Sequence, residues 1–317
     1  MRGDPGARAA APAQSFAFVE GALDRADALR GHPEALQAHW GRARVLVLDA
    51  DGRTRSVDGV DGGGVSLSGG DIGPGPGDAV FLGMSADTAW FALPAEALGA
   101  ASPEARAAWE AGKPIDLRAA AAVWPAAEAT AFAQARAVLH WRARHRFCPS
   151  CAGALVYERG GWLGRCTACS LEQYPRTDPA VIVAVTDGER LLLGRQASWP
   201  ARRYSTLAGF VEPGETLEQT VAREVMEESG VRVRRSRYLG SQPWPFPSSL
   251  MLGFVAEAEP DPPQSDQELE DVRWYSREEI GAALRGETAE DGLLLSPRVS
   301  ISRWLIEAWH AGVGIDG

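Results

Sequence analysis

The sequence of 317 residues predicts an α/β/α sandwich with a mixed sheet in its C-terminal half, preceded by a small ribbon and an N-terminal α+β domain. Three observations support this prediction. An almost continuous apolar run at residues 180–185 is typical of a strand buried on both faces. Strand-like and helix-like segments alternate after this run, which favours a sheet between helices. Two Cys-x-x-Cys pairs lie before it, at 148–151 and 166–169.

The chain is expected to divide into four parts. These are a lead-in at 1–14, an N-terminal α+β domain at 15–144, a ribbon at 145–175 and a C-terminal domain at 176–317. The lead-in lacks the apolar core of a secretory signal. It is expected to be disordered, as chain ends often are.

The N-terminal domain alternates short strands with turn-rich loops. Strands are expected at 44–48, 79–83 and 88–93, with a turn at Asp51-Gly52 and loops or a hairpin tip across 57–77. Pro94 and Pro103 introduce helical segments, and a longer helix is expected at 126–144. No site can be named in this domain from its sequence, so a scaffold role is expected.

Composition favours a soluble globular protein. The chain is 45% hydrophobic and 23% charged, with a formal net charge of −10. This acidic balance disfavours broad binding to nucleic-acid backbones, which needs a basic surface. No stretch reaches the ~18 uninterrupted apolar residues that a membrane span needs. We therefore expect a cytoplasmic protein with no membrane segment.

All four cysteines of the chain lie in two knuckles, Cys148/Cys151 and Cys166/Cys169. Two knuckles at this separation indicate one tetrahedral Zn²⁺ held by four thiolates. Because a closed four-sulfur site leaves no position for a reacting water, this zinc is expected to be structural. Disulfides are the alternative, which the absence of a secretory signal disfavours. Zinc ribbons also occur in nucleic-acid-binding proteins, which keeps a binding module as a second hypothesis.

A helix is expected from 217 to 229, because its start and its end are both marked in the sequence. Thr216 and Gln219 have the spacing of a capping box. Gly230 suits the left-handed residue that ends a helix. The apolar face of this helix consists of Leu217, Val221 and Val225.

Glu224, Glu227 and Glu228 form an acidic stripe beside that apolar face, at the seam between core and solvent. Three carboxylates this close repel one another. Arg223 and Arg202 or Arg203 are expected to be too few and too loosely placed to neutralise all three. A hard divalent cation with oxygen ligands, Mg²⁺ or Mn²⁺, would resolve the repulsion. A solvated acidic helix face is the alternative.

The C-terminal domain continues as strands and turns on both sides of this helix. Strands are expected at 180–185, 190–195, from 237, at 250–258 and around Trp274-Tyr275, and a turn is expected at Asp187-Gly188. A final helix is expected at 297–311, with Ile301, Leu305 and Trp309 on one face.

Residues 241–249, SQPWPFPSS, alternate prolines with aromatic residues. Proline fixes its own φ and restricts the residue before it. Trp244 and Phe246 are therefore expected to point to one side of a stiff segment. Rigid aromatic side chains suit a flat base, since stacking is worth ~1–3 kcal/mol per base. A proline-rich linker or a peptide ligand for an SH3-type domain is the alternative.

Residues 209–231 resemble the complete signature of the Nudix hydrolases, which act on diphosphates. The resemblance runs through Gly209, Glu215 and the segment REVMEESGV at 223–231, where every fixed position is filled. It implies a metal-dependent hydrolase with a loop–helix–loop around the acidic stripe. Gly209, Glu215, Arg223 and Gly230 are then expected to be structural, with Glu215 paired to Arg223.

The SQPWPFPSS segment and the order of the domains resemble the NADH pyrophosphatases (NAD diphosphatases of the NudC type) within that superfamily. The resemblance implies a Nudix-like N-terminal domain, a homodimer and a dinucleotide substrate. That substrate is NADH or NAD⁺, cut at the diphosphate into nicotinamide mononucleotide and AMP. Some members remove an NAD cap from RNA, which makes capped RNA a further expected substrate.

Site residues follow from this resemblance position by position. The catalytic and metal-binding carboxylates are expected to be Glu224, Glu227 and Glu228, joined at two or three Mg²⁺ or Mn²⁺ by Glu268 and the backbone of Ala208. Substrate contacts are expected from Tyr174, Phe210, Gln242, Pro243, Trp244, Pro245, Phe246, Pro247, Ser248, Ser249 and Ser302. Ser302 stands where the family often has alanine.

The expected reaction is attack of an activated water on one phosphorus, with Glu228 or Glu227 taking a proton from that water. A Nudix hydrolase of ADP-ribose or another nucleoside diphosphate derivative is the alternative among enzymes. An RNA-binding regulator with a zinc ribbon and a nucleotide-sensing Nudix domain is the alternative of another class. The acidic charge and the filled signature disfavour the regulator.

Overall fold

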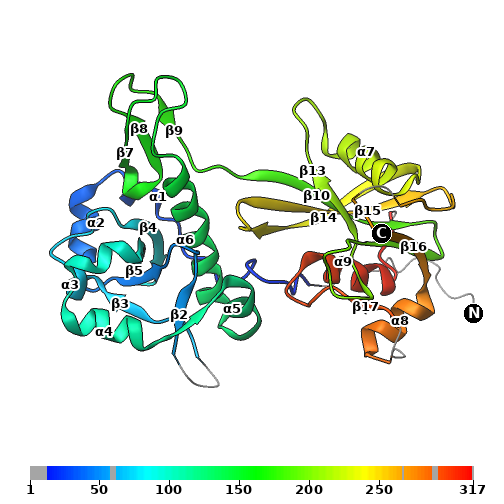
Figure 1. The fold of residues 1–317 in the computed structure, drawn as a ribbon, viewed down its shortest axis with the longest axis horizontal. Helices are drawn as coiled ribbons and strands as arrows, with labels where there is room; N and C mark the ends of the chain where they lie inside the picture. The colour runs from blue at the N-terminus through cyan, green and yellow to red at the C-terminus, as the bar shows by residue number, and fades with distance from the viewer. Residues whose placement is uncertain (1–12, 58–61, 266–267, 288–291, 316–317) are drawn as a thin grey trace, which may run out of the picture. The chain divides into compact units, whose positions relative to one another are not determined.

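The computed structural model describes residues 13–57, 62–265, 268–287 and 292–315 (Figure 1). The chain forms two compact units. One unit contains Ala17–Thr177 together with Trp244–Ser248. The other contains the described residues of Met1–Phe16, Asp178–Pro243 and Ser249–Gly317. Residues 1–12 of the predicted lead-in lie outside the described residues.

The N-terminal domain is a four-stranded sheet with a hydrophobic core on each face. Its order is β3 (Ser66–Ser68), β1 (Arg44–Leu48), β5 (Thr88–Pro94) and β4 (Val80–Ser85), and β1 and β5 are parallel. Side chains alternate along a strand, so Leu46 faces one core and Val47 the other. The first core includes residues of α5 (Leu117–Val123) and α6 (Ala126–Arg144). The second includes residues of α2 (Pro33–Trp40) and α4 (Pro103–Ala111).

The larger predicted elements of this domain are confirmed, and one predicted loop is wrong in part. Further short elements are α1 (Asp27–Arg30), α3 (Gly69–Ile72), η1 (Ala95–Ala100), β2 (Thr54–Ser56) and β6 (Lys113–Ile115). Both β3 and α3 lie inside the loop predicted at 57–77. Leu67 and Ile72 are buried. Their burial orders a segment whose glycine and proline content had indicated only turns.

The ribbon belongs to the same compact unit as the N-terminal domain. It is a three-stranded sheet of β7 (Leu155–Glu158), β8 (Leu163–Cys166) and β9 (Glu172–Gln173), with η2 (Arg159–Gly161) after β7. Trp162 Nε1 donates to the Phe81 carbonyl at 2.7 Å. The Arg30 guanidinium lies 4.1 Å from the centroid of the same indole ring. The indole therefore fastens the ribbon to the N-terminal sheet.

The C-terminal unit is built on a mixed sheet, as predicted. Its order is β14 (Val233–Trp244), β15 (Ser249–Ala258), β10 (Asp178–Thr186), β11 (Arg190–Arg195) and β16 (Asp271–Ser276). β10 and β15 are parallel, whereas β11 is antiparallel to both β10 and β16. β13 (Leu207–Phe210) also pairs with β10, and β12 (Arg203–Tyr204) pairs with β17 (Leu294–Leu295).

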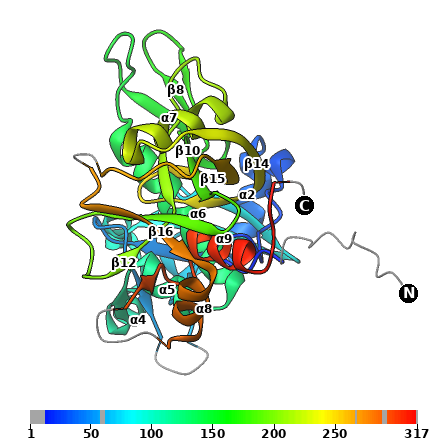
Figure 2. The ribbon, with the colours of Figure 1, turned by 90° about the vertical axis from the view of Figure 1, so that its right-hand side faces the viewer.

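Helices cover both faces of this sheet (Figure 2). On one face, Val181 and Val183 of β10 pack with Val221 and Val225 of α7 (Leu217–Ser229). On the opposite face, the Thr186 hydroxyl accepts from Trp309 Nε1 of α9 (Ile301–His310) at 3.0 Å. This arrangement is the predicted α/β/α sandwich. Within the part of the chain that is described, none of the helices combines the length and apolar character needed to cross a bilayer.

The helices of this unit differ from the prediction in two places. α8 (Arg277–Arg285) was not predicted, although Ser276 and Glu279 form a capping box and Gly286 ends the helix with φ 75°. α9 begins at Ile301, later than the predicted 297, because the Ser300 hydroxyl caps its first turn. The predicted face of α9, formed by Ile301, Leu305 and Trp309, is buried as expected.

Candidate functional site

The acidic stripe lies on α7, and the predicted signals at both ends of this helix are present. The Thr216 hydroxyl accepts from Gln219 N at 3.2 Å, and Gln219 Oε1 accepts from Thr216 N at 2.8 Å. Gly230 closes the helix with φ 68° in the left-handed region. The capping box and the terminal glycine therefore fix where the stripe begins and ends.

The three glutamates of the stripe lie at different depths. The Glu224 side chain is 14% exposed and that of Glu227 is 56% exposed. Glu228 is 4% exposed as a residue. The stripe therefore runs from the core to solvent, as predicted for a seam. A wholly solvated acidic face does not describe it.

Glu224 packs against the backbone of β13 at Gly209. A Cβ built on Gly209 would lie 1.8 Å from Glu224 Cδ and 2.0 and 2.1 Å from its two oxygens. Only a residue without a side chain leaves room for this carboxyl group. Ala208, the predicted backbone ligand, is the preceding residue of β13 and pairs with Ile182 of β10. Glycine at position 209 thus allows the Glu224 carboxylate to lie close to the β13 backbone.

Burial raises the pKa of Glu224 above its ordinary value, and the charges of Glu227 and Glu268 raise it further. Glu268 comes just before β16, far from α7 in sequence, yet its charge acts on Glu224. The structure therefore brings the distant carboxylate into the electrostatic neighbourhood of the stripe. A cation at this place would relieve the repulsion that disfavours ionised Glu224.

Arg223 joins the residues of the predicted signature through five hydrogen bonds. It donates to Glu215 at 2.6 and 2.8 Å, to Glu224 and Glu227 at 2.9 Å each, and to the Phe210 carbonyl at 2.9 Å. The predicted pair with Glu215 is confirmed, and these hydrogen bonds lower the pKa of Glu215 to about 2. The expectation that Arg223 is too loosely placed was wrong. One guanidinium nevertheless faces three carboxylates, so negative charge remains.

The donor set suits Mg²⁺ or Mn²⁺, which prefer carboxylate and carbonyl oxygens. The glycine that admits Glu224 and the raised pKa of this carboxyl group agree with a cation site. Among the described side chains, the four cysteines are the only group of three or more potential ligands whose donor atoms all lie within 4.8 Å of one another.

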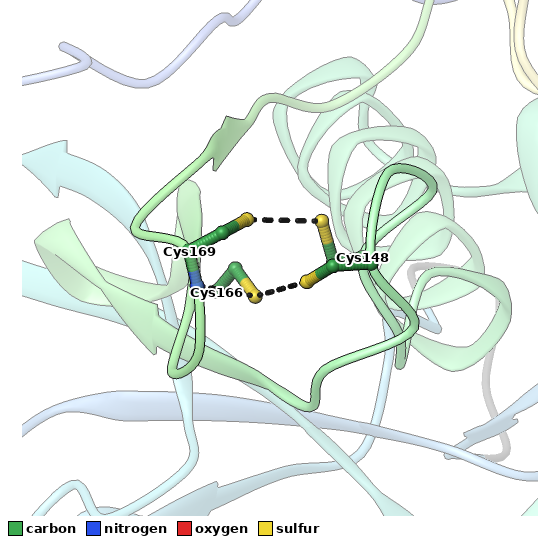
Figure 3. A group of neighbouring side chains, drawn as sticks. Cys148, Cys166 and Cys169 are labelled. Atoms are coloured by element: carbon green, nitrogen blue, oxygen red, sulfur yellow. Dashed lines mark hydrogen bonds between the residues drawn. The ribbon is translucent and has the colours of Figure 1, made fainter.

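The four sulfurs of the ribbon form a closed group (Figure 3). Cys148 Sγ lies 3.7 Å from Cys169 Sγ, and Cys151 Sγ lies 3.4 Å from Cys166 Sγ. Four thiolates at ~2.3 Å from a tetrahedral Zn²⁺ would be separated by about 3.8 Å. Backbone N–H groups of Cys169 and Ala168 lower the pKa of Cys166 to about 6. No disulfide joins these cysteines, so the geometry fits one structural zinc.

Comparison with known families assigns all three parts of the chain. Residues 176–295 match the NUDIX domain, and residues 143–174 match the NADH pyrophosphatase zinc ribbon domain. Residues 40–141 match the NADH pyrophosphatase-like rudimentary NUDIX domain. The third match agrees with the expected Nudix-like N-terminal domain.

Relatives with a curated description cover nearly the whole chain. The NAD-capped RNA hydrolase NudC of Mycobacterium bovis is 40% identical over 298 residues, which is 91% of this chain and 92% of the relative. The chain belongs to the NudC family of Nudix hydrolases. The human NAD-capped RNA hydrolase NUDT12 is 42% identical over 57% of this chain and 42% of its own length. A solved NUDIX hydrolase from Nitrosomonas europaea is 24% identical, with a TM-score of 0.42 over 53% of this chain and 94% of its own.

In this Nudix hydrolase, the segment of alternating prolines is a tight connection between two strands. β14 extends through Trp244, a turn occupies 245–248, and β15 begins at Ser249. Gln242 is fully buried, with Oε1 accepting from Ile301 N at 2.8 Å and Nε2 donating to the Val299 carbonyl at 2.7 Å. Its amide group therefore ties β14 to the start of α9.

The two aromatic rings of this turn point the same way, as predicted, with centroids 4.9 Å apart. Both pack against the core that α5 and α6 cover. The Arg118 and Arg136 guanidinium groups lie 4.2 and 5.0 Å from the Phe246 centroid, and Arg136 donates to the Pro245 carbonyl. The rings are thus partly buried among arginines. Their predicted contact with a substrate base stays a prediction.

The remaining predicted contacts of the Nudix site differ in exposure. Tyr174 and Phe210 are exposed aromatic residues, available to a planar ligand. Ser302 is 1% exposed, and its hydroxyl is hydrogen-bonded to Ser205 and Thr206. A direct contact of this hydroxyl with substrate is therefore not supported by the geometry. Sequence reasoning missed Ser205 and Thr206, because only the fold brings them next to α9.

The C-terminal unit also contains a cavity of about 570 Å³ that lies between β12, β16 and α8. Arg202, Tyr204, Arg273 and Tyr275 line it, and none of the four glutamates does. Arg273 and Tyr204 both donate to Asp271, and Arg202 donates to the Gly292 carbonyl at 3.2 Å. Because the lining residues do not include these glutamates, the cavity is separate from the candidate catalytic site.

Proposed function

We propose that this Nudix hydrolase is an NAD(H) diphosphatase. It would cut the diphosphate of NADH or NAD⁺ to give nicotinamide mononucleotide and AMP. Two or three Mg²⁺ or Mn²⁺ ions would be held by Glu224, Glu227, Glu228, Glu268 and the Ala208 carbonyl. The other expected substrate contacts are Tyr174, Phe210 and the residues of the proline–aromatic turn.

The observation that carries this proposal is the setting of Glu224. Its carboxyl group is pressed against Gly209, has a raised pKa, and is influenced by the charges of Glu227 and Glu268. Carboxylates gathered under mutual repulsion mark a site whose charge balance needs a cation. Substrate identity is supported by the relatives, which are NAD-capped RNA hydrolases.

The residues of the site would share the work in a defined way. When bound, the divalent ions would offset the charge of the diphosphate and lower the pKa of the attacking water. Glu228, the most buried glutamate of the stripe, would take the proton from that water, with Glu227 as the alternative base. Arg223 would keep the loop that contains Glu215 against α7. Phe210, exposed at the end of β13, would offer a face to one base.

Removal of an NAD cap from RNA is a second activity of the same site. The relatives at 40% and 42% identity are described as NAD-capped RNA hydrolases. In an NAD-capped RNA, the RNA chain continues from the adenosine of the NAD group, and the diphosphate is the same as in free NAD⁺. The same diphosphate would therefore be cut. Gel analysis of an NAD-capped RNA oligonucleotide incubated with the protein would test this activity, and an unchanged cap would contradict it.

Product analysis tests the main proposal. NADH is incubated with the protein and Mn²⁺ or Mg²⁺, and the products are separated by chromatography. Equal amounts of AMP and reduced nicotinamide mononucleotide are expected. Hydrolysis of ADP-ribose with intact NADH would instead favour the other Nudix activity. RNA binding that persists at moderate salt without any hydrolysis would favour a regulator.

We further propose a homodimer in the cytoplasm, on the strength of the family resemblance. Light scattering coupled to size-exclusion chromatography would test the dimer. A mass equal to one chain would contradict it.

A further inference from the structure

We propose that Ser302, Gln242 and Thr206 are positioning residues that hold β13 in place for metal binding. This inference rests on the proposed function, because it assigns β13 a role at the metal site. It replaces the expected roles of Ser302 and Gln242 as substrate contacts. All three side chains are buried, and all lie in the C-terminal unit.

Ser302 has no hydrogen-bonding capacity left for a substrate. A hydroxyl offers one donor and two acceptor positions. Ser302 Oγ accepts from Thr206 N at 3.2 Å and from Thr206 Oγ1 at 3.0 Å. Its own proton is then left for Ser205 Oγ at 2.8 Å. The hydroxyl is fully used in joining α9 to the residues that lead into β13.

Gln242 fixes the other side of the same helix start. Its amide group bonds the Ile301 N–H and the Val299 carbonyl, on the two sides of the N-cap residue Ser300. Ser302 N in turn donates to the Ser300 hydroxyl at 3.2 Å. Gln242 of β14 therefore holds the first turn of α9 against the sheet. This contact also fixes the position of Ser302, which lies in the same turn.

Thr206 connects the fixed start of α9 to β13, the strand beside the candidate metal site. It directly precedes Leu207, the first residue of β13, while Ser205 exchanges backbone hydrogen bonds with Gly194 at 2.9 and 3.0 Å. Two residues beyond Thr206 is Ala208, and the next is Gly209, whose Cα faces the Glu224 carboxyl group. Metal–ligand distances tolerate only ±0.2 Å, and Mg²⁺ needs near-ideal octahedral geometry. A small shift of β13 would therefore weaken binding.

Two substitutions separate this role from general stability. Ser302→Ala removes the hydroxyl that receives both groups of Thr206, and Thr206→Val removes one of these bonds while keeping the shape of the side chain. Thr206→Ser retains the hydroxyl and is the conservative variant. Thr54→Val is the matched control, because the buried Thr54 hydroxyl donates to the Val47 carbonyl at 2.8 Å in the other unit.

The readout is the dissociation constant for Mn²⁺, measured by electron paramagnetic resonance of free Mn²⁺ on full-length protein without substrate. Loss of a group that orients a metal ligand typically costs 10- to 100-fold in affinity. We expect about a tenfold weaker Mn²⁺ affinity for Ser302→Ala and Thr206→Val. Thr206→Ser and Thr54→Val should match the wild type. Zinc content should be one per chain in all variants.

Mn²⁺ affinities of Ser302→Ala and Thr206→Val within twofold of wild type would overturn the inference, as would a wild-type protein that binds no Mn²⁺. If Ser302→Ala does not fold, Thr206→Val decides on its own. NADH hydrolysis by the wild type is measured in parallel. A protein that binds Mn²⁺ but leaves NADH intact would contradict the proposed function alone. The Mn²⁺ affinities of the variants would still test the inference.

Discussion

The two candidate metal sites of this chain are organised in opposite ways. The four sulfurs of the ribbon already lie within 4.8 Å of one another, with backbone N–H groups directed at Cys166. The glutamates of α7 are instead held by Arg223, which bonds both Glu224 and Glu227. A structural site is closed by the fold alone. In the candidate catalytic site, one guanidinium bonds two of the carboxylates, and a cation would add the positive charge that this guanidinium does not supply.

The physical reason for this difference is charge. Thiols can be neutral before zinc arrives, so short knuckles can gather them without repulsion. Carboxylates at neutral pH repel one another, and an arginine among them lowers that repulsion. The comparison predicts that changes at the glutamates alter turnover with zinc unchanged, whereas changes at the cysteines alter zinc and stability together.

Glu228→Gln should give the largest effect. Removal of the general base is expected to lower turnover of NADH by about 10²- to 10⁴-fold. Zinc content and the thermal unfolding midpoint should match the wild type. Initial rates from product chromatography provide the measurement. Glu218→Gln, an exposed change on the same helix, is the control and should retain full activity. Near-normal turnover in Glu228→Gln would refute its assignment as base.

Cys148→Ser should separate the ribbon from the catalytic site. Loss of one thiolate should remove the single zinc, because a structural zinc site contributes directly to folding. We expect a clear fall in the unfolding midpoint, measured by calorimetry, with zinc measured by plasma emission. Ser150→Ala, an exposed change in the same knuckle, should retain zinc. Full zinc occupancy in Cys148→Ser would contradict the four-sulfur assignment.

Gly209→Ala should weaken metal binding with little effect on folding. The new Cβ would overlap the Glu224 carboxyl group, which lies at the end of a flexible side chain and can move aside. Displacing this ligand should raise the Mn²⁺ concentration for half-maximal activity about tenfold. Gly99→Ala is the control, since no atom lies within 4 Å of the Cβ position there. An unchanged Mn²⁺ requirement would show that Glu224 does not bind metal from this position.

Glu215→Gln should give the smallest effect, and one that depends on pH. Arg223 lowers the pKa of Glu215 from 4.5 to about 2 in the folded protein. For a carboxyl group with a lowered folded pKa, the stabilisation is present above the unfolded pKa and is lost as pH falls toward the folded one. The difference in unfolding midpoint between wild type and variant should therefore be largest at pH 7 and shrink between pH 4.5 and pH 2. A difference that is constant with pH would contradict the ion pair.

Local signals in the sequence predicted the frame of the site well. The capping box at Thr216 and Gln219, the terminal Gly230 and the cysteine knuckles depend on residues close in sequence, so spacing alone reveals them. The same kind of signal marks α8 at Ser276 and Glu279 and was overlooked. Sequence reasoning could have found this helix.

Long-range contacts could not be predicted in this way. The burial of Ser302 against Thr206 and the packing of Phe246 against Arg118 and Arg136 join residues far apart in sequence. Family resemblance gave Ser302 and Gln242 a role without showing which neighbours use their hydrogen bonds. Only the fold shows that these polar groups are already satisfied.

The most direct test of the central claim is a Mn²⁺ binding isotherm of the wild type and of the double variant Glu224→Gln/Glu227→Gln, with zinc measured in the same samples. The account predicts two or three Mn²⁺ per wild-type chain, at least one fewer in the double variant, and one zinc in both. Equal Mn²⁺ stoichiometry and affinity in the two proteins would contradict it, because the acidic stripe would then not bind the cation.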